Sequence, residues 1–144
     1  MFFTEDSGEI DASKDITPQI DVTKNVKIRA IAHNAINDNK PVILFLDENG
    51  NVKCQMGETD TTALEGCKPG YWGVVEVGGS IGDVVDVIVH GKAKVTNINN
   101  ALTPNHQVKS INGAGFIVAQ AETDSTTENA YLAVVLSNDT IFIY

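Results

Sequence analysis

The fold is decided by the stretch Gly82-Asp83-Val84-Val85-Asp86-Val87-Ile88-Val89-His90-Gly91-Lys92-Ala93-Lys94-Val95. Five of its first eight residues are Val or Ile, the β-branched residues that fit the pleated surface of a sheet. Gly91 tolerates a positive φ, so Val89-His90-Gly91 matches a common three-residue hairpin loop. The stretch therefore predicts a β-hairpin with its turn at His90 and Gly91.

The side chains on the two arms of this predicted hairpin indicate its register. A three-residue loop sets Val87 opposite Ala93 on one face and Asp86 opposite Lys94 on the other. The second pair has opposite charges, a contact that contributes roughly 0.2–1 kcal/mol across an antiparallel pair. One apolar face and one charged face predict an antiparallel sheet that is buried on one side.

Further short strands are predicted on both sides of this stretch. Val26–Ala32 alternates apolar and basic residues, and Pro41–Leu46 is a continuous apolar run typical of a strand buried on both faces. The other predicted strands are 52–55, 71–77, 107–111, 116–121, 130–136 and 140–144. Residues 56–70 are predicted to form a loop with at most one helical turn, capped by Asp60. The pattern predicts an all-β protein, a small antiparallel β-barrel or a sandwich.

A weak internal similarity links two parts of the chain. Lys40-Pro41-Val42 followed by Gly50-Asn51-Val52 resembles His106-Gln107-Val108 followed by Gly113 and Gly115-Phe116-Ile117. Each set precedes a Val-rich segment, 73–95 in the first case and 117–136 in the second. This similarity predicts two pairs of hairpins wrapped into one small barrel.

The first 24 residues differ from the rest of the chain. They hold six acidic residues against Lys14 and Lys24, and their few apolar residues show no sustained period. We expect residues 1–24 to form an extended N-terminal arm and residues 25–144 a single β-barrel domain. The arm is either a solvated terminus or a segment that orders on a partner, with Phe2 and Phe3 as anchors.

The composition limits which classes of partner the protein is expected to bind and the redox compartment in which it is expected to work. The chain has 144 residues, 42% of them hydrophobic, and a net charge of -9. This acidity argues against binding to nucleic acid or anionic membranes and is compatible with a basic protein partner. The first residues lack the basic and apolar regions of a secretory signal, so we expect free thiols at Cys54 and Cys67, with a disulfide as the alternative.

Residue patterns for catalysis or metal binding are weak. His33, His90 and His106 have no second His or Cys at metal-ligand spacing, so no metal site is predicted. Asp83 and Asp86 fall on opposite faces of the predicted strand, which favours a turn cap and a cross-strand charge partner over an acid–base pair.

Three other motifs have a structural explanation as well as a functional one. Ser80 lies in a G-x-S-x-G pattern, but a nucleophile elbow requires a following helix and here a strand is predicted. The acidic and amide side chains of 47–51 offer oxygens to Ca²⁺, but turn formation explains them better. Tyr71 and Trp72 are candidates for a sugar-binding groove, although such a pair is more often core or subunit contact.

The order of these segments resembles the head decoration proteins of tailed bacteriophages, also called cement or capsid-stabilising proteins. The resemblance covers roughly residues 26–137 and is one of pattern. It is carried by Tyr71-Trp72-Gly73-Val74-Val75-Glu76, the Gly-Gly turn, Gly82–Val87, His90–Val95, Lys40-Pro41-Val42 with Gly50-Asn51-Val52, Gln107-Val108 with Gly113–Phe116, Val118–Ala121 and Leu132–Leu136.

The resemblance implies a small barrel of the β-tulip type and a homotrimer on the outer surface of an icosahedral virion. There it would bridge subunits of the major capsid protein, without enzymatic activity, cofactor, nucleic acid or membrane. The arm would contact the capsid, and the residues assigned to this contact are Met1, Phe2, Phe3, Ile10, Ile16 and Ile20.

Two alternatives from other classes remain open. One is a ligand- or carbohydrate-binding β-domain of a fibre or surface protein, which would use Tyr71, Trp72 and the 47–51 turn. The other is a small hydrolase that uses Ser80 or Asp83.

Overall fold

The computed structural model describes residues 25–57, 64, 70–96, 102–111, 115–119 and 132–144. The predicted arm and the helical turn after Asp60 lie outside these residues. The described part holds nine strands and no helix, hence none long and apolar enough to cross a membrane. The strands are β1 (Val26–Ala32), β2 (Lys40–Leu46), β3 (Val52–Gln55), β4 (Trp72–Val75), β5 (Val84–Lys94), β6 (Gln107–Ile111), β7 (Phe116–Ala119), β8 (Ala133–Ser137) and β9 (Thr140–Ile143).

Five strands close into a small β-barrel, which confirms the all-β prediction. Their order is β1-β3-β2-β4-β5, and β1 also pairs with β5 to close the ring. The pairs are antiparallel except for β1 and β3, which run parallel at Ile31–Lys53 and Ala32–Cys54. The sequence pattern predicted an antiparallel barrel, and the parallel β1–β3 pair differs from that prediction.

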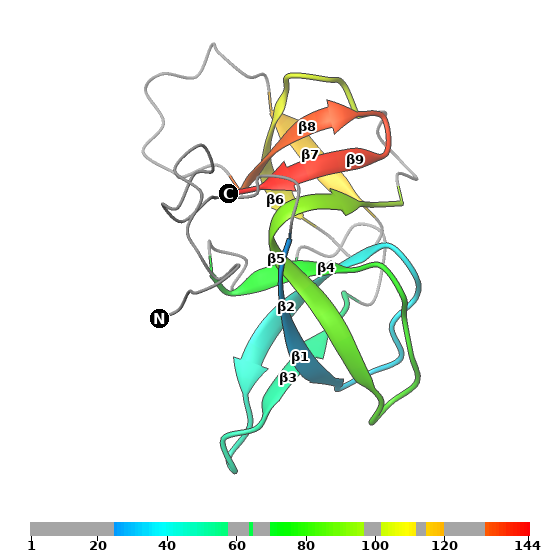
Figure 1. Cartoon of the computed structure of the whole chain (residues 1–144), viewed down its shortest axis with the longest axis vertical. Coiled ribbons are helices and arrows are strands. Elements are labelled where there is room, and N and C mark those ends of the chain that lie inside the picture. Colours follow the sequence, from blue (N-terminus) through cyan, green and yellow to red (C-terminus); the bar gives the residue numbers. More distant parts are fainter. Residues whose placement is uncertain (1–24, 58–63, 65–69, 97–101, 112–114, 120–131) are drawn as a thin grey trace, which may run out of the picture.

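The predicted hairpin at His90 and Gly91 is wrong, because β5 is one continuous strand. Its first part, from Val84, pairs with β1, and Gly91–Lys94 pair with β9 instead of folding back. Gly91 does have a positive φ, 108°. At this point β5 passes from the barrel into a second sheet (Figure 1). Asp86 is consequently paired with Arg29, and the predicted Asp86–Lys94 pair does not exist.

The second sheet repeats the strand order of the barrel. The barrel runs β3-β2-β4-β5, and the second sheet runs β7-β6-β8-β9. Just as β1 pairs with the first part of β5, the last part of β5 pairs with β9. We call β1–β4 with Val84–Ile88 the first unit, and Gly91–Lys94 with β6–β9 the second unit.

The pairing register agrees at equivalent positions of the two units, although β6–β7 carries a register shift that β2–β3 does not. Val42 lies opposite Gly73 in the first unit, and Val108 lies opposite Ala133 in the second. Lys27 lies opposite Ile88, and Lys92 lies opposite Phe142. The predicted internal similarity is thus a structural repeat. The prediction that both halves wrap into one barrel is wrong, since β1–β5 close a barrel by themselves.

Each unit has its own hydrophobic core, and β4 lies between the two. Val75, together with Val85 and Val87 of β5, belongs to the core of the barrel. Trp72 and Val74 belong to the core of the second unit, because alternate residues of a strand point to opposite faces. All four residues of β4 are buried for this reason.

The prediction that β2 is buried on both faces holds only at its start. Lys40, Pro41 and Val42 are buried, but burial decreases along the strand and Leu46 is 67% exposed. The strand leaves the space between the two cores and ends at the tip of the β2–β3 hairpin, which lies at the lower end of the molecule (Figure 1).

Candidate interaction surface

A hollow of about 560 Å³ lies on the outside of the barrel. It is formed by β1, the first part of β5 and both ends of the β4–β5 connection. This connection consists of residues 76–83. Its apolar lining is Val77, Val84, Val85 and Ile88, and its charged lining is Lys27, Arg29, Glu76, Asp83 and Asp86.

Many hydrogen bonds hold the β4–β5 connection in one conformation. Gly79 exchanges two backbone hydrogen bonds with Ile36, both 2.9 Å, and the Gly78 N–H donates to Asp38 Oδ1 at 2.7 Å. The Gly82 N–H donates to the carbonyl of Ala32 at 2.9 Å, which ties the end of the connection to β1. A Cβ at Gly78 would overlap the Ile36 carbonyl oxygen, so the close approach requires glycine.

This fixed connection presents apolar side chains to solvent. Val77 is 77% exposed, Ile81 is 71% exposed, and Val84 at the start of β5 is 63% exposed. Val77 and Val84 both line the hollow, and Ile81 lies between them in the chain. Exposed apolar residues that line one hollow, as Val77 and Val84 do, mark a contact site more often than scattered ones do. We call Val77, Ile81 and Val84 the apolar face.

Charges of both signs surround the apolar face. Arg29 Nε lies 3.7 Å from Asp86 Oδ1, and both side chains are exposed, so the pair contributes little to stability. Lys27 makes no ion pair within the part of the chain that the structure describes. Glu76 Oε2 accepts a hydrogen bond from the Lys94 N–H at 2.8 Å.

The excess of acidic residues in the chain falls outside the described residues. The described residues contain seven basic and seven acidic residues, so the net charge of -9 is carried by the remaining segments. Residues 1–24 alone hold six acids against two lysines. The barrel and the second sheet are therefore close to neutral, in contrast to the acidic surface that the whole composition indicated.

The predicted roles of Asp83 and Asp86 as structural residues are confirmed. Asp83 Oδ2 accepts a hydrogen bond from the Ser80 N–H at 2.8 Å, as a turn cap does. Asp86 is a cross-strand charge partner, but of Arg29. Ser80 lies in a connection between two strands, which is not the strand-to-helix turn of a nucleophile elbow.

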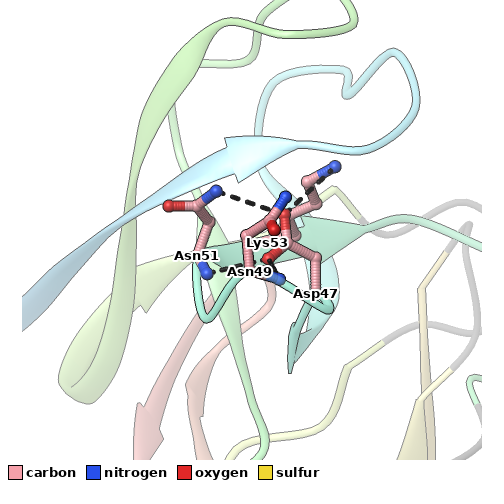
Figure 2. A network of polar contacts seen from close by, with 4 residues as sticks. All are labelled: Asp47, Asn49, Asn51 and Lys53. Carbon is pink, nitrogen blue, oxygen red and sulfur yellow. Dashed lines mark hydrogen bonds and ion pairs between the residues drawn. The ribbon is translucent and has the colours of Figure 1, made fainter.

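The carboxylate of Asp47 is the centre of the polar contacts in the 47–51 turn (Figure 2). Asp47 Oδ1 accepts hydrogen bonds from the N–H groups of Asn49 at 2.8 Å and Asn51 at 2.9 Å. Asp47 Oδ2 accepts from Asn51 Nδ2 at 3.3 Å and lies 3.7 Å from Lys53 Nζ. These contacts, above all the hydrogen bond from the Asn51 N–H, lower the pKa of Asp47. The turn interpretation thus accounts for both carboxylate oxygens of Asp47, one of the residues considered as Ca²⁺ ligands.

The two aromatic candidates for a sugar groove do not lie together on the surface. Trp72 is 1% exposed and packs edge-to-face against Phe116, with ring centroids 6.0 Å apart. Tyr71 is 59% exposed. Trp72 is therefore a core residue, and Tyr71 is the one of the pair that a ligand could reach.

The histidines lie on different elements of the fold, and the His33 N–H donates a hydrogen bond to the carbonyl oxygen of Cys54 at 2.8 Å. His33 packs edge-to-face on Phe45, and His90 packs edge-to-face on Phe142, within β5 and not in a turn. Cys54 is a free, buried thiol, as predicted, and burial raises its pKa to about 11. No group of three His, Cys, Asp or Glu that could hold a metal occurs among the described residues.

Several predicted residues cannot be placed, and one surface was not predicted. The capsid-contact residues Met1, Phe2, Phe3, Ile10, Ile16 and Ile20, and also Cys67, lie outside the described residues. The sequence pattern does not predict the apolar face, because it places Val77 and Val84 in strands and leaves Ile81 between a turn and a strand. An apolar residue within a Gly-rich turn, as in Gly79-Ser80-Ile81-Gly82, was the available signal.

No family model, curated protein or solved structure matches this chain.

Proposed function

We propose that this protein is a capsid decoration protein, which binds the outer surface of an icosahedral phage head and stabilises it by bridging subunits of the major capsid protein. The observation that carries the proposal is the apolar face, which hydrogen bonds hold in place next to a hollow of about 560 Å³. Such a surface suits contact with another protein. The order of sequence segments described above supplies the identity of the partner.

The proposed mechanism is mechanical and needs neither a catalytic group nor a cofactor. A homotrimer places three arms on one body, and linkage raises the effective concentration of the second and third arms once the first is bound. Modest affinity per arm then suffices for stable attachment. The six acids of residues 1–24 require a basic counterpart on the shell, and Phe2 and Phe3 provide apolar anchors.

Co-sedimentation with expanded, undecorated heads of the phage that encodes the chain tests this function. We expect the wild-type chain to pellet with the heads and the Phe2→Ser, Phe3→Ser double variant to stay in the supernatant. Thr4→Ser is the matched control for an arm substitution that keeps both anchors. Absence of wild-type binding would contradict the function, and binding that survives removal of residues 1–24 would contradict the role of the arm alone.

A further inference from the structure

The turn between β2 and β3 contains the pair Asn49-Gly50 at its exposed tip. The φ of Gly50 is 83°, in the left-handed region that glycine adopts readily. Asp47 Oδ1 accepts hydrogen bonds from the backbone N–H groups of Asn49 and Asn51, on both sides of Gly50 (Figure 2). The turn therefore uses the backbone of Asn49 for its own structure.

The side-chain amide of Asn49 differs in its contacts from those of Asn51 and Asn34. It makes no hydrogen bond among the residues that the structure describes. Asn51 Nδ2 donates to Asp47 Oδ2 at 3.3 Å, and the Asn34 side chain both donates to and accepts from the backbone of Met56. Of these three amides, the one at Asn49 is therefore free to change its conformation.

The residue that follows Asn49 suits an attack on this amide from within the chain. The backbone nitrogen of residue 50 can bond to Asn49 Cγ and close a five-membered ring. A side chain on the attacking residue hinders this closure, and glycine has none. A Cβ at Gly50 would meet nothing within 4 Å, so neighbouring groups do not block the ring either. Asn51 and Asn34, by contrast, are followed by Val52 and Ala35.

One contact in the turn slows this attack in the folded protein. The Gly50 N–H donates to the carbonyl oxygen of Asp47 at 3.0 Å, and this hydrogen bond must open before the nitrogen can react. Because both residues of the Asn-Gly pair are exposed, water can take the place of the carbonyl oxygen. The net strength of such a hydrogen bond corresponds to a decrease in rate of about tenfold at most.

We propose that Asn49 is a site of deamidation, which the chain carries out on itself with water as the co-reactant. The Gly50 nitrogen loses its proton to solvent and bonds to Asn49 Cγ. The bond from Cγ to the side-chain nitrogen breaks, and that nitrogen takes up a proton and leaves as ammonia. Water then opens the cyclic imide at one of its two carbonyl carbons. The product is aspartate or isoaspartate at residue 49, and no oxidant or reductant is involved.

The two products affect the turn differently. Both add one negative charge beside Asp47 and Glu48, which takes the net charge of the chain from -9 to -10. Aspartate keeps the backbone as it is. Isoaspartate inserts one more backbone carbon into a turn that the Asp47 N–H closes by donating to the Asn51 carbonyl oxygen at 3.0 Å. We therefore expect isoaspartate to loosen the β2–β3 hairpin and aspartate to leave it closed.

Incubation of the full chain at mildly alkaline pH, followed by trypsin digestion and tandem mass spectrometry, tests the proposal. In peptide 30–53, Asn49 should be converted to the acid while Asn34 and Asn51 keep their amides. Cleavage after Lys53 separates this peptide from the second Asn-Gly pair, Asn112-Gly113, so the two are measured independently. A sample in denaturant gives the rate of the unfolded chain, and the folded chain should be slower by about tenfold at most.

Two variants test whether the conversion proceeds through the proposed ring. Asn49→Gln keeps the backbone N–H that Asp47 accepts, but its longer side chain would have to close a six-membered ring, so residue 49 should keep its amide. Gly50→Ala should slow conversion by about tenfold or more in denaturant, where strain in the folded turn plays no part.

Conversion at residue 49 that both variants suppress, with Asn51 unchanged, supports the proposal. An amide retained at Asn49 in the folded protein while the unfolded chain converts would overturn it. Conversion of Asn51 as fast as that of Asn49, or a wild-type rate for Gly50→Ala in denaturant, would overturn it as well.

Discussion

Asn39 and Asn105 adopt the same left-handed backbone conformation at the same point of the two units. Their φ angles are 58° and 73°, and each residue precedes the first hairpin of its unit. They are the only residues other than glycine with a positive φ in the part of the chain that the structure describes. The repeat therefore extends from strand order and register to a specific turn conformation.

This relationship predicts how the two positions respond to substitution. Asn39→Ala and Asn105→Ala should each lower the free energy of unfolding by about 1 kcal/mol, because the short polar side chain of Asn lets it adopt the left-handed region more readily than Ala does. Asn39→Gly and Asn105→Gly should be close to neutral. Denaturant unfolding measures both, with Asn37→Ala as a control at an exposed Asn whose φ is not positive. Equal effects of Ala and Gly would contradict the shared conformation.

Gly91 should be more sensitive than other glycines of positive φ. Gly91→Ala adds backbone strain and a Cβ that overlaps Asn25 Oδ1, whereas Gly50→Ala adds strain alone, since a Cβ there meets nothing within 4 Å. We expect a loss of about 1 kcal/mol at Gly50 and more than 2 kcal/mol at Gly91 in denaturant unfolding.

A second substitution separates the two effects at Gly91. Asn25→Gly removes the overlapping side chain, together with its hydrogen bond to the Lys92 N–H of 2.9 Å. It should therefore restore part of the stability of Gly91→Ala while lowering that of the wild type. Equal losses in the free energy of unfolding for Gly91→Ala and Gly50→Ala would contradict the close approach of Asn25 to Gly91 in β5.

Trp72 and Tyr71, although adjacent, should differ strongly in how much their substitution lowers stability. Trp72→Ala should cost about 3–5 kcal/mol because it empties the contact between β4 and the core of the second unit. Tyr71→Ala, at an exposed position, should change stability by less than about 0.5 kcal/mol. Since the chain has one tryptophan, its fluorescence should resist aqueous quenchers until the protein unfolds. Quenching in the native state would argue that Trp72 is accessible and would reopen its role in a groove.

Cys54 should be unreactive in the folded protein and should make stability depend on high pH. Burial raises the pKa of Cys54 from 9.0 to about 11, which favours the neutral thiol in the folded state. This contribution is fully present below the unfolded pKa and is lost as pH rises through about 11, because the unfolded chain releases the proton first. In a Cys67→Ser background, a thiol reagent at neutral pH should label Cys54 at the rate of unfolding. Fast labelling under native conditions would contradict the burial.

The strands could be predicted from the sequence because the residue patterns that form them are local. Val26–Ala32 and Val52–Gln55 have the predicted bounds, and the Asn-Gly turn between β2 and β3 is where the residues indicated. Even the repeat was visible in the similarity of Lys40-Pro41-Val42 to His106-Gln107-Val108.

Pairing between strands that are far apart in the chain could not be predicted in the same way. Gly91 at positive φ suits a hairpin loop and also a bend within a strand. Ala93 and Lys94 satisfy the same alternation opposite Ile141 and Thr140 as opposite Val87 and Asp86. The choice depends on β9, which lies almost fifty residues further along and whose partner no local pattern specifies. The exposure of Val77 and Val84 depends on this same tertiary arrangement.

The most direct test of the proposed function is the stability of the phage head with and without the protein. Undecorated, DNA-filled heads are incubated with the wild-type chain, and release of DNA is measured on heating. If the protein is a capsid decoration protein, heads that carry it should retain their DNA at temperatures where bare heads lose it. Heads that bind the protein and release DNA at the same temperature as bare heads would contradict the claim that it works as a clamp.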